Sequence, residues 1–506
     1  MSLHGRLTLH PAFRIAPVRP RTFGAFVEHM GRCVYTGIFE PGHPRADSDG
    51  LRTDVLELTR ELGVSAVRYP GGNFVSGYRW EDGVGPVEER PARRDLAWHS
   101  TEPNTFGVDE FMSWTEGADV EPMMAVNLGT RGIEEAVDLL EYCNGEAGTA
   151  LADQRVRNGR TEPYGIRMWC LGNEMDGPWQ LGHVPAEDYA RLAAGTARAM
   201  RRAEEDLELI GCGSSHWAMD TFGDWERAVL EASYDEIDMI SAHVYHQERD
   251  GDSASYLAVA DDMDGYIDAV VATCDHVRGS LKRDKRIMIS FDEWNVINTE
   301  GDTGEEPSGK DWPVAPRFAE STYTAQDAVV LGSLLISLLR HSDRVASASL
   351  AQLVNVLAPI RTEPGGSAWR QTIFHPFALT SKHASGDVLR PQIDSPTFEN
   401  RRFGTSAVLD AACTWDEEAG ELTVFAVNRS LEEPLALEVP LEGFGDLTLV
   451  EGTMLHESDR HARNTAEAPD AVVPRPLPDA RLDDSSVTAT LPPVSWTMLR
   501  LQATAL

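Results

Sequence analysis

One repeated pattern constrains the fold of this chain more than any other feature. Eight short runs of apolar or small residues recur, each followed by polar residues and usually by a longer stretch with helical periodicity. The runs cover residues 23–27, 65–67, 122–126, 167–170, 209–212, 238–242, 286–290 and 345–350. Runs of this length without alternation suit strands buried on both faces of a parallel sheet. Eight strands alternating with helices predict a (β/α)₈ TIM barrel rather than an open sheet.

The segments between the runs support this prediction. Apolar residues recur three and four positions apart in the segments 54–62, 132–142, 186–202 and 325–339. That spacing places them on one face of a helix, which can pack against the outside of a barrel.

After about residue 380 the pattern changes to short alternating runs separated by turn residues. These runs are 422–428, 435–440, 447–451, 487–491 and 496–501. Such a series predicts an all-β sandwich of the jelly-roll kind. We expect a barrel over residues 16–380 and a sandwich over 381–506, joined by the weakly alternating residues 1–15. The Pro-rich stretch 457–484 is predicted to be a long exposed loop.

Charge and cysteine usage narrow the classes of function. The 81 acidic and 45 basic residues give a formal net charge of −36, which repels nucleic acid and anionic membranes. No run of about 18 apolar residues and no signal-peptide pattern is present. The six cysteines lack C-x-x-C spacing, which indicates buried free thiols in a reducing compartment. We therefore expect a cytoplasmic protein without nucleic-acid or membrane partners.

Two of the predicted strand ends carry carboxylates. Asn173-Glu174 follows the fourth run, and Asp292-Glu293 follows the seventh. In a (β/α)₈ barrel the active site forms at the carboxyl ends of the strands, so these groups should meet in one cavity. Glycoside hydrolysis needs two carboxyl groups that flank the scissile bond. The residues alone leave open which carboxyl would protonate the leaving group and which would attack.

Other strand ends supply polar groups that suit a sugar. The uncharged amide of Asn173 can bond a hydroxyl without competing for the catalytic proton. Tyr245 and Arg68 could keep a nucleophilic carboxylate ionised, and Arg68 could also anchor Glu28. An ion pair between Arg68 and Glu28 with a purely structural role is an equally good interpretation.

The histidines near the sixth strand end are ambiguous. His243 and His246 could simply pack, and they make a poor metal site because strand alternation places them on different faces. Two inter-strand segments, 77–104 and 296–321, are too long and polar to be simple connectors. We expect both segments to overhang the mouth of the barrel and shape a binding site.

Four motifs together resemble the α-L-arabinofuranosidases of glycoside hydrolase family 51. They are Phe26-Val-Glu-His-Met-Gly31, Arg68-Tyr-Pro-Gly-Gly-Asn-Phe74, Trp169-Cys-Leu-Gly-Asn-Glu-Met-Asp-Gly-Pro-Trp-Gln180 and Asp292-Glu-Trp-Asn295. The resemblance covers essentially the whole chain, and the twelve-residue block around Glu174 is its most specific part.

The resemblance implies a role for each candidate residue. Glu174 would be the acid/base and Glu293 the nucleophile of a retaining enzyme, with their carboxyl groups about 5–5.5 Å apart. The family also implies no metal or other cofactor, and a homohexamer. The implied sugar-site residues are Glu28, Asn73, Asn173 and Gln352 on the hydroxyls, Arg68 and Tyr245 positioning Glu293, and Trp98 and Trp179 as walls.

The expected activity is exo-acting removal of α-L-arabinofuranosyl groups from oligosaccharides derived from arabinoxylan or arabinan. An endo-β-1,4-glucanase or β-xylosidase on the same scaffold, or a catalytically silent sugar-binding protein, is the alternative. The linkage that the enzyme prefers does not follow from the sequence.

Overall fold

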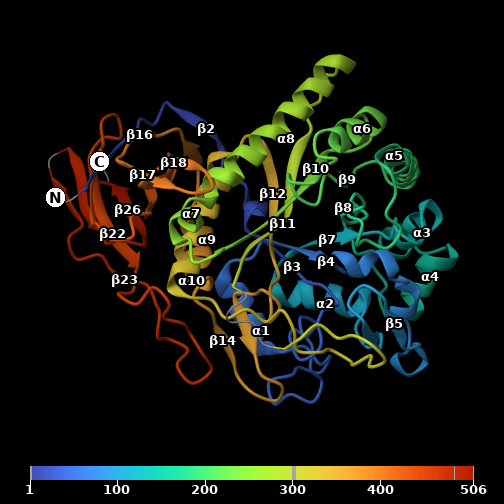
Figure 1. Ribbon diagram of the computed structural model, residues 1–506. Helices are drawn as coiled ribbons and strands as arrows, with labels where there is room; N and C mark the ends of the chain where they lie inside the picture. Colours follow the sequence, from blue (N-terminus) through green and yellow to red (C-terminus); the bar gives the residue numbers. More distant parts are fainter. Residues whose placement is uncertain (1–2, 299–303, 484, 505–506) are drawn as a thin grey trace.

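The predicted barrel is present as a closed ring of parallel strands (Figure 1). The computed structural model describes residues 3–298, 304–483 and 485–504. Every predicted run overlaps one barrel strand, which confirms the (β/α)₈ prediction. In ring order the strands are β3 (Gly24–Phe26), β4 (Ala66–Tyr69), β7 (Glu121–Ala125), β8 (Met168–Leu171), β9 (Glu208–Gly211), β10 (Met239–Gln247), β11 (Met288–Ile297) and β12 (Val345–Ala351).

Helices cover the outside of the ring, as their apolar spacing predicts (Figure 1). They are α1 (Thr53–Leu62), α2 (Val108–Ala118), α3 (Ile133–Asn144), α4 (Ala150–Arg157), α5 (Ala186–Ala203), α6 (Asp224–Ser233), α7 (Ser253–Leu257), α8 (Val259–Leu281), α9 (Ala325–Arg340) and α10 (Phe374–His383). Helix α1 illustrates how a local sequence ends a helix. Gly63 follows it with φ of 76° and donates its N–H to the Arg60 carbonyl, a left-handed cap that glycine adopts without strain.

Helix α9 differs from the other helices because it is buried on all sides. Every residue from Ala325 to Leu339 is buried, and the helix contacts β11 on one side and the C-terminal strands β19, β20 and β26 on the other. Gly332 permits this packing, since a Cβ there would lie 2.2 Å from Cδ1 of Trp496. A helix that is predominantly apolar on all its faces is stable inside a core.

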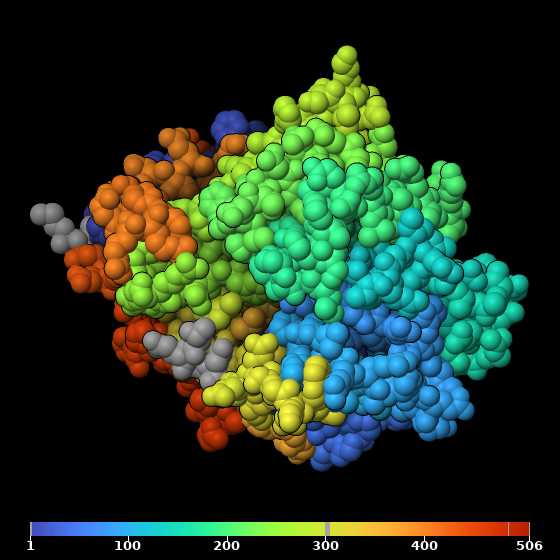
Figure 2. Space-filling model, turned by 45° about the vertical axis from the view of Figure 1, so that its right-hand side comes forward, coloured from blue at the N-terminus to red at the C-terminus, as the bar shows by residue number. Residues whose placement is uncertain are grey.

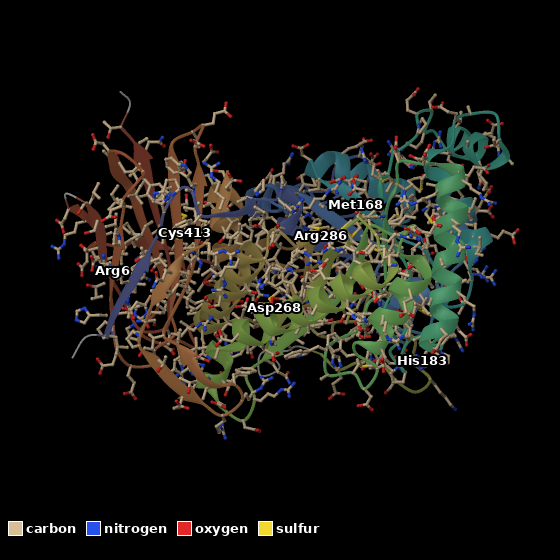
Figure 3. The ribbon with its side chains drawn as sticks, turned by 90° about the horizontal axis from the view of Figure 1, so that it is seen from above. Arg6, Met168, His183, Asp268, Arg286 and Cys413 are labelled. Atoms are coloured by element: carbon tan, nitrogen blue, oxygen red, sulfur yellow. The ribbon has the colours of Figure 1, made fainter. Side chains whose placement is uncertain are left out.

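The C-terminal part is a two-sheet sandwich, as predicted. One sheet has the order β16 (Gln392–Asp394), β1 (Leu3–Thr8), β21 (Leu435–Pro440), β25 (Ser486–Leu491) and β24 (Arg481–Asp483). The other has the order β2 (Arg14–Pro17), β15 (Asp387–Leu389), β19 (Leu409–Asp416), β20 (Glu421–Asn428), β26 (Ser495–Ala503), β22 (Leu447–Leu455) and β23 (Arg475–Pro476). The N-terminal strands thus pair with C-terminal ones. Figure 3 shows Arg6 and Cys413 in this part, at a distance from Met168 in the barrel.

In the described part of the chain, four short strands after β12 lie outside the barrel and the sandwich. They form two hairpins, β13 (Ile360–Thr362) with β14 (Ala368–Arg370), and β17 (Thr397–Asn400) with β18 (Gly404–Ala407). The stretch 457–484 is less uniform than the predicted exposed loop. It contains β23 and β24, which pair with the edges of β22 and β25, while residue 484 is outside the described residues.

A buried ionic cluster, the interface cluster, joins the barrel helices to the sandwich. Asp410 on β19 bonds to Arg340 at the end of α9 and lies 2.6 Å from Nη2 of Arg429. Arg340 also donates to Asp264, and Arg429 donates to Asp261, at 2.6 and 2.8 Å. Both arginines therefore connect α8 with the sandwich.

The two long inter-strand segments meet over the carboxyl ends of the strands. The first forms a hairpin of β5 (Arg93–Asp95) and β6 (Ser100–Glu102). His99 in its turn stacks on Trp312 with ring centroids 3.7 Å apart, and Thr101 donates to the Trp312 carbonyl at 2.7 Å. Figure 2 shows residues near 310 against residues near 100. The predicted overhang is therefore present, although residues 299–303 of the second segment are outside the described residues.

The six cysteines are all buried and free, which confirms the expectation of unpaired thiols. Across the described ranges, none of the helices combines the length and the apolar character that crossing a membrane requires.

Candidate active site

A cavity of about 190 Å³ lies at the carboxyl ends of the barrel strands. Seven of the ten candidate residues line it, namely Glu28, Asn73, Trp98, Glu174, Tyr245, Glu293 and Gln352. Arg68 and Asn173 lie in the layer beneath, each 1% exposed. Trp179 lies at the rim and is half exposed. The strand ends that the sequence singles out therefore converge, including the two carboxylates that lie more than a hundred positions apart.

The carboxylate of Glu293 is held at both oxygens. Arg68 donates from Nη1 to Oε1 at 2.6 Å, and the Tyr245 hydroxyl donates to Oε2 at 3.0 Å. Arg68 also donates from Nη2 to Oδ1 of Asn173 at 2.7 Å. Charge-assisted bonds of this kind fix the orientation of a carboxylate and favour its ionised form. Arg68 and Tyr245 thus contact the carboxylate that the resemblance names as their partner.

Glu174 occupies a different environment. It follows β8 with φ of 44°, and its side chain is 12% exposed. Nδ1 of His243 lies 2.9 Å from Oε1, and Trp179 donates from Nε1 to Oε2 at 2.8 Å. Burial raises the pKa of Glu174, and the charge of Glu293 raises it further, while His243 and Trp179 act in the opposite direction. A carboxyl group with a raised pKa can carry a proton to a leaving group.

His243 connects the two carboxylates and was left unassigned by the sequence. Its Nε2 lies 2.9 Å from Oδ1 of Asp292, and its Nδ1 lies 3.7 Å from Oε2 of Glu293 as well as close to Glu174. Burial lowers the pKa of His243, but Glu293, Asp292 and Glu174 together raise it to about 10. The ring is therefore an imidazolium at neutral pH, held between acidic partners.

Asp292 completes this arrangement from below. Burial raises its pKa, yet Arg68 and His243 hold the pKa of Asp292 below its ordinary value. Strand alternation would send Asp292 and Glu293 to opposite faces. The register shows why both face His243: Ser241 pairs with Ser290 but His243 pairs with Glu293, so β11 carries one extra residue, a β-bulge.

A weak signal in the sequence could have identified His243 as a residue of the active site. It lies two positions before Tyr245 on the same strand, so alternation places both side chains on the same, inward face. The bulge that brings Asp292 into contact with it has no comparable signal.

Glu28 is held by three N–H donors. Phe74 N and Trp98 Nε1 donate to Oε1 at 3.0 and 2.9 Å, and Gln352 Nε2 donates to Oε2 at 3.1 Å. Burial and the charge of Glu293 raise the pKa of Glu28 to about 8, against the effect of the Phe74 and Trp98 bonds. The possible pairing of Glu28 with Arg68 is wrong within the described residues, because Arg68 is directed to Glu293, Asn173 and Asp292 instead.

Two glycines allow the loop after β4 to lie on these carboxylates. A Cβ at Gly71, where φ is 152°, would lie 2.5 Å from Cγ of Glu28. A Cβ at Gly72 would lie 2.9 Å from Oε1 of Glu293. The floor of the cavity therefore depends on backbone that no larger residue could replace without a shift.

One group of side chains has the spacing of metal ligands. Single ligand atoms of Glu174, His243 and Glu293 lie within 4.8 Å of one another. A metal ligand must be deprotonated, but His243 bonds to carboxylates through both nitrogens and its pKa keeps it charged. His246 is not part of this group among the described residues, and its ring lies 3.9 Å from Asp262. The cluster suits proton chemistry better than metal binding.

Comparison with known proteins agrees with this geometry. Residues 58–266 match the family described as α-L-arabinofuranosidase 1 domain, and residues 292–495 match the α-L-arabinofuranosidase C-terminal domain. The chain is also 49% identical to a solved family 51 α-L-arabinofuranosidase from Bifidobacterium longum, with a TM-score of 0.95 over 99% of this chain and 100% of that one. The chain belongs to the α-L-arabinofuranosidases of glycoside hydrolase family 51.

Two further relatives are similar along nearly the whole chain. An intracellular exo-α-(1→5)-L-arabinofuranosidase from Streptomyces lividans is 57% identical over 98% of this chain and 75% of the relative. An exo-α-(1→6)-L-arabinofuranosidase from Bifidobacterium longum is 53% identical over 98% of this chain and 97% of the relative. The barrel and the sandwich are thus both parts of the family fold.

Proposed function

We propose that this chain is a retaining exo-α-L-arabinofuranosidase that removes terminal α-L-arabinofuranosyl groups from oligosaccharides derived from arabinan or arabinoxylan. The observation that carries the proposal is the placement of Glu174 and Glu293 across one small cavity. An oxygen of each lies within 4.8 Å of the other. This separation fits retaining glycosidases, at about 5–5.5 Å, rather than inverting ones, at about 6.5–9.5 Å.

The size of the cavity supports exo action. Its volume of about 190 Å³ is below the range of about 300–1,000 Å³ in which pockets hold drug-sized ligands. Room for about one sugar ring, with Glu28 and the glycine loop closing the floor, favours a chain end over an internal segment. This feature argues against the endo-glucanase alternative.

In the first half of the proposed reaction Glu293 attacks the anomeric carbon. A bond forms between that carbon and a Glu293 oxygen while the bond to the leaving-group oxygen breaks, and Glu174 gives its proton to that oxygen. Arg68 and Tyr245 hold Glu293 ionised and oriented for attack. The raised pKa of Glu174 favours the protonated form that this step requires.

In the second half Glu174, now a carboxylate, takes a proton from water. The resulting hydroxide attacks the anomeric carbon, the ester bond to Glu293 breaks, and arabinose leaves with the original anomeric configuration. His243 remains between the two carboxyl groups throughout, so its positive charge offsets the ionised Glu174 of this stage.

The remaining candidates are assigned to the sugar. Glu28, Asn73 and Gln352 line the cavity with amide and carboxyl groups that suit hydroxyls. Trp98 and Trp179 form walls, with Trp179 bonded to Glu174, and Asn173 is bonded to Arg68 beneath the sugar. We assign no cofactor to the reaction.

The physiological setting is a further part of the proposal. Relatives from Streptomyces lividans and Bacillus subtilis are named intracellular exo-α-(1→5)-L-arabinofuranosidases. We propose a cytoplasmic enzyme that acts on imported short arabino-oligosaccharides and assembles as a hexamer. Light scattering of the purified chain tests the hexamer, and a mass of one or two subunits would refute it.

The activity is tested by comparing three substrates. The proposed enzyme hydrolyses nitrophenyl α-L-arabinofuranoside much faster than nitrophenyl β-xyloside or soluble cellulose. Preference for the xyloside or for cellulose would support the alternative glycosidases. Binding of arabino-oligosaccharides without turnover of any glycoside would support a catalytically silent protein.

A further inference from the structure

A second cavity of about 480 Å³ adjoins the proposed active site. It lies at the same end of the barrel, where β10 and β11 end, and its opposite wall comes from the sandwich. Ile297 lines both this cavity and the smaller one that contains Glu293. The two spaces therefore share a wall at the end of β11.

The wall from the sandwich is a docked segment. The carbonyls of Arg460 and Ala462 accept hydrogen bonds from the backbone N–H groups of Gln326 and Ala325, at 3.0 and 2.9 Å. These bonds fix residues 460–463 on the first turn of α9. Because these bonds use two N–H groups at the N-terminus of α9, a ligand in this cavity would be bound by side chains instead.

Two of those side chains are arginines that form no ion pair with a described carboxylate. Arg460 and Arg463 line the cavity and are half-buried, and no carboxylate within the described ranges lies at ion-pair distance from either. The side chain of Arg460 bonds to the neighbouring ring of His461, at 3.2 Å. Among the described residues both arginines thus face the cavity without a carboxylate partner, so their guanidinium N–H groups are available to a ligand.

The opposite wall carries the complementary groups. Glu248 and Asp250 extend from the end of β10 into the same lining, and Gln326 holds one Glu248 oxygen at 2.8 Å. Guanidinium groups donate to hydroxyl oxygens, and carboxylates accept from hydroxyl hydrogens. Because both signs of charge face the cavity, its lining suits a neutral molecule rich in hydroxyls rather than an anion.

The distance along β11 places this cavity further toward the mouth of the barrel than Glu293. Ile297 lies four positions after Glu293, which corresponds to about 13 Å at the usual rise of a strand. We propose that this second cavity binds the distal sugars of an arabino-oligosaccharide whose terminal unit occupies the active site. The inference rests on the proposed function and adds to it a segment of the sandwich that selects longer chains.

The test is a chain-length series with the double variant R460A/R463A. The unaltered enzyme and the variant are compared on nitrophenyl α-L-arabinofuranoside and on linear (1→5)-linked arabino-oligosaccharides of two to five units. We expect kcat/KM of the unaltered enzyme to rise with length, and the variant to lose about tenfold on the longest substrates. Turnover of the nitrophenyl substrate, which is too short to reach the arginines, should be unchanged.

The matched control is R481A, which removes an exposed arginine of β24, the edge strand of the five-stranded sheet of the sandwich. It should follow the unaltered enzyme at every chain length. An identical length profile in R460A/R463A and the unaltered enzyme, or an equal loss on all substrates including the nitrophenyl one, would refute the second site. Failure of the unaltered enzyme to cleave any arabinofuranoside would refute the proposed function instead.

Discussion

The barrel mouth and the interface between barrel and sandwich both bury carboxylates, but with opposite effects on their acidity. Asp410 at the interface contacts two arginines, Arg340 and Arg429, and although burial raises its pKa these cations hold the pKa below its ordinary value. Glu174 at the mouth contacts His243 but no arginine among its described partners, and burial with a second carboxylate nearby raises its pKa. The number of cations per carboxylate separates a structural anion from a proton donor.

The largest expected effect follows from removing the nucleophile. Glu293→Ala should lower kcat by about 10⁴-fold or more, because no other group can form the covalent intermediate. The melting temperature should change little, since Arg68 retains Asn173 and Asp292 as neighbours. Steady-state kinetics and thermal unfolding of one preparation measure both quantities. Substantial residual turnover would remove Glu293 from the proposed role.

Removing the proton donor should give an effect that depends on the leaving group. Glu174→Ala should cost about 10²–10⁴-fold on natural oligosaccharides, and far less on aryl arabinofuranosides whose leaving groups need little protonation. A Brønsted series of aryl substrates measures this dependence. Equal losses on both classes of substrate would contradict an acid role for Glu174.

Substitution of the buried carboxylate at the interface should lower stability and leave activity unchanged, the opposite of the expectation for the barrel mouth. Asp410→Ala leaves Arg340 and Arg429 buried without their shared partner, so it should cost about 3–5 kcal/mol of stability. Activity per folded molecule should stay unchanged. Denaturant unfolding and steady-state kinetics measure the two effects. A loss of activity without a loss of stability would contradict a structural role for Asp410.

The same residue gives a pH-dependent prediction. Because the folded-state pKa of Asp410 is depressed, its contribution to stability is complete above its unfolded pKa of about 3.9 and is lost as pH falls through the folded value. The difference in melting temperature between the unaltered enzyme and Asp410→Asn should therefore be constant near neutral pH and narrow below about pH 4. A difference that grows on acidification would have the wrong sign.

The smallest effect concerns the imidazolium between the carboxylates. His243 lowers the pKa of Glu174 by hydrogen bonding and by its positive charge. In His243→Gln that pKa should rise, so the alkaline limb of the kcat/KM profile should move to higher pH while the enzyme remains active. The control is the profile of His246→Gln, whose ring is outside this group. A limb that is unmoved or shifted to lower pH would exclude the assigned role of His243.

The sequence predicts the barrel and its two carboxylates for one physical reason. Buried parallel strands read as short apolar runs, and polar residues that follow them must lie at one end of the ring, so Glu174 and Glu293 converge whatever the details of packing. The all-β tail is equally visible in its alternating strands. Trp98 could be placed only by family resemblance, because its loop has no periodicity.

The features of the site that could not be predicted from the sequence depend on the register and closure of the barrel strands. A single extra residue in β11 brings Asp292 to the same side as Glu293, and no residue type marks that bulge. The expected contact of Arg68 with Glu293 is present, but its possible pairing with Glu28 is wrong for a related reason. Its strand neighbour in β3 is Phe26, and the guanidinium is directed across the ring toward β11 rather than toward Glu28, a choice that only the closed ring determines.

Helix α9 has a consequence for how this chain can be made and engineered. Its apolar surface is covered by the barrel on one side and by strands up to β26 on the other, and β26 ends only at Ala503. During synthesis one face of α9 therefore remains uncovered until almost the entire chain has left the ribosome. We expect a truncated barrel to aggregate, so the sandwich cannot be exchanged as a detachable module.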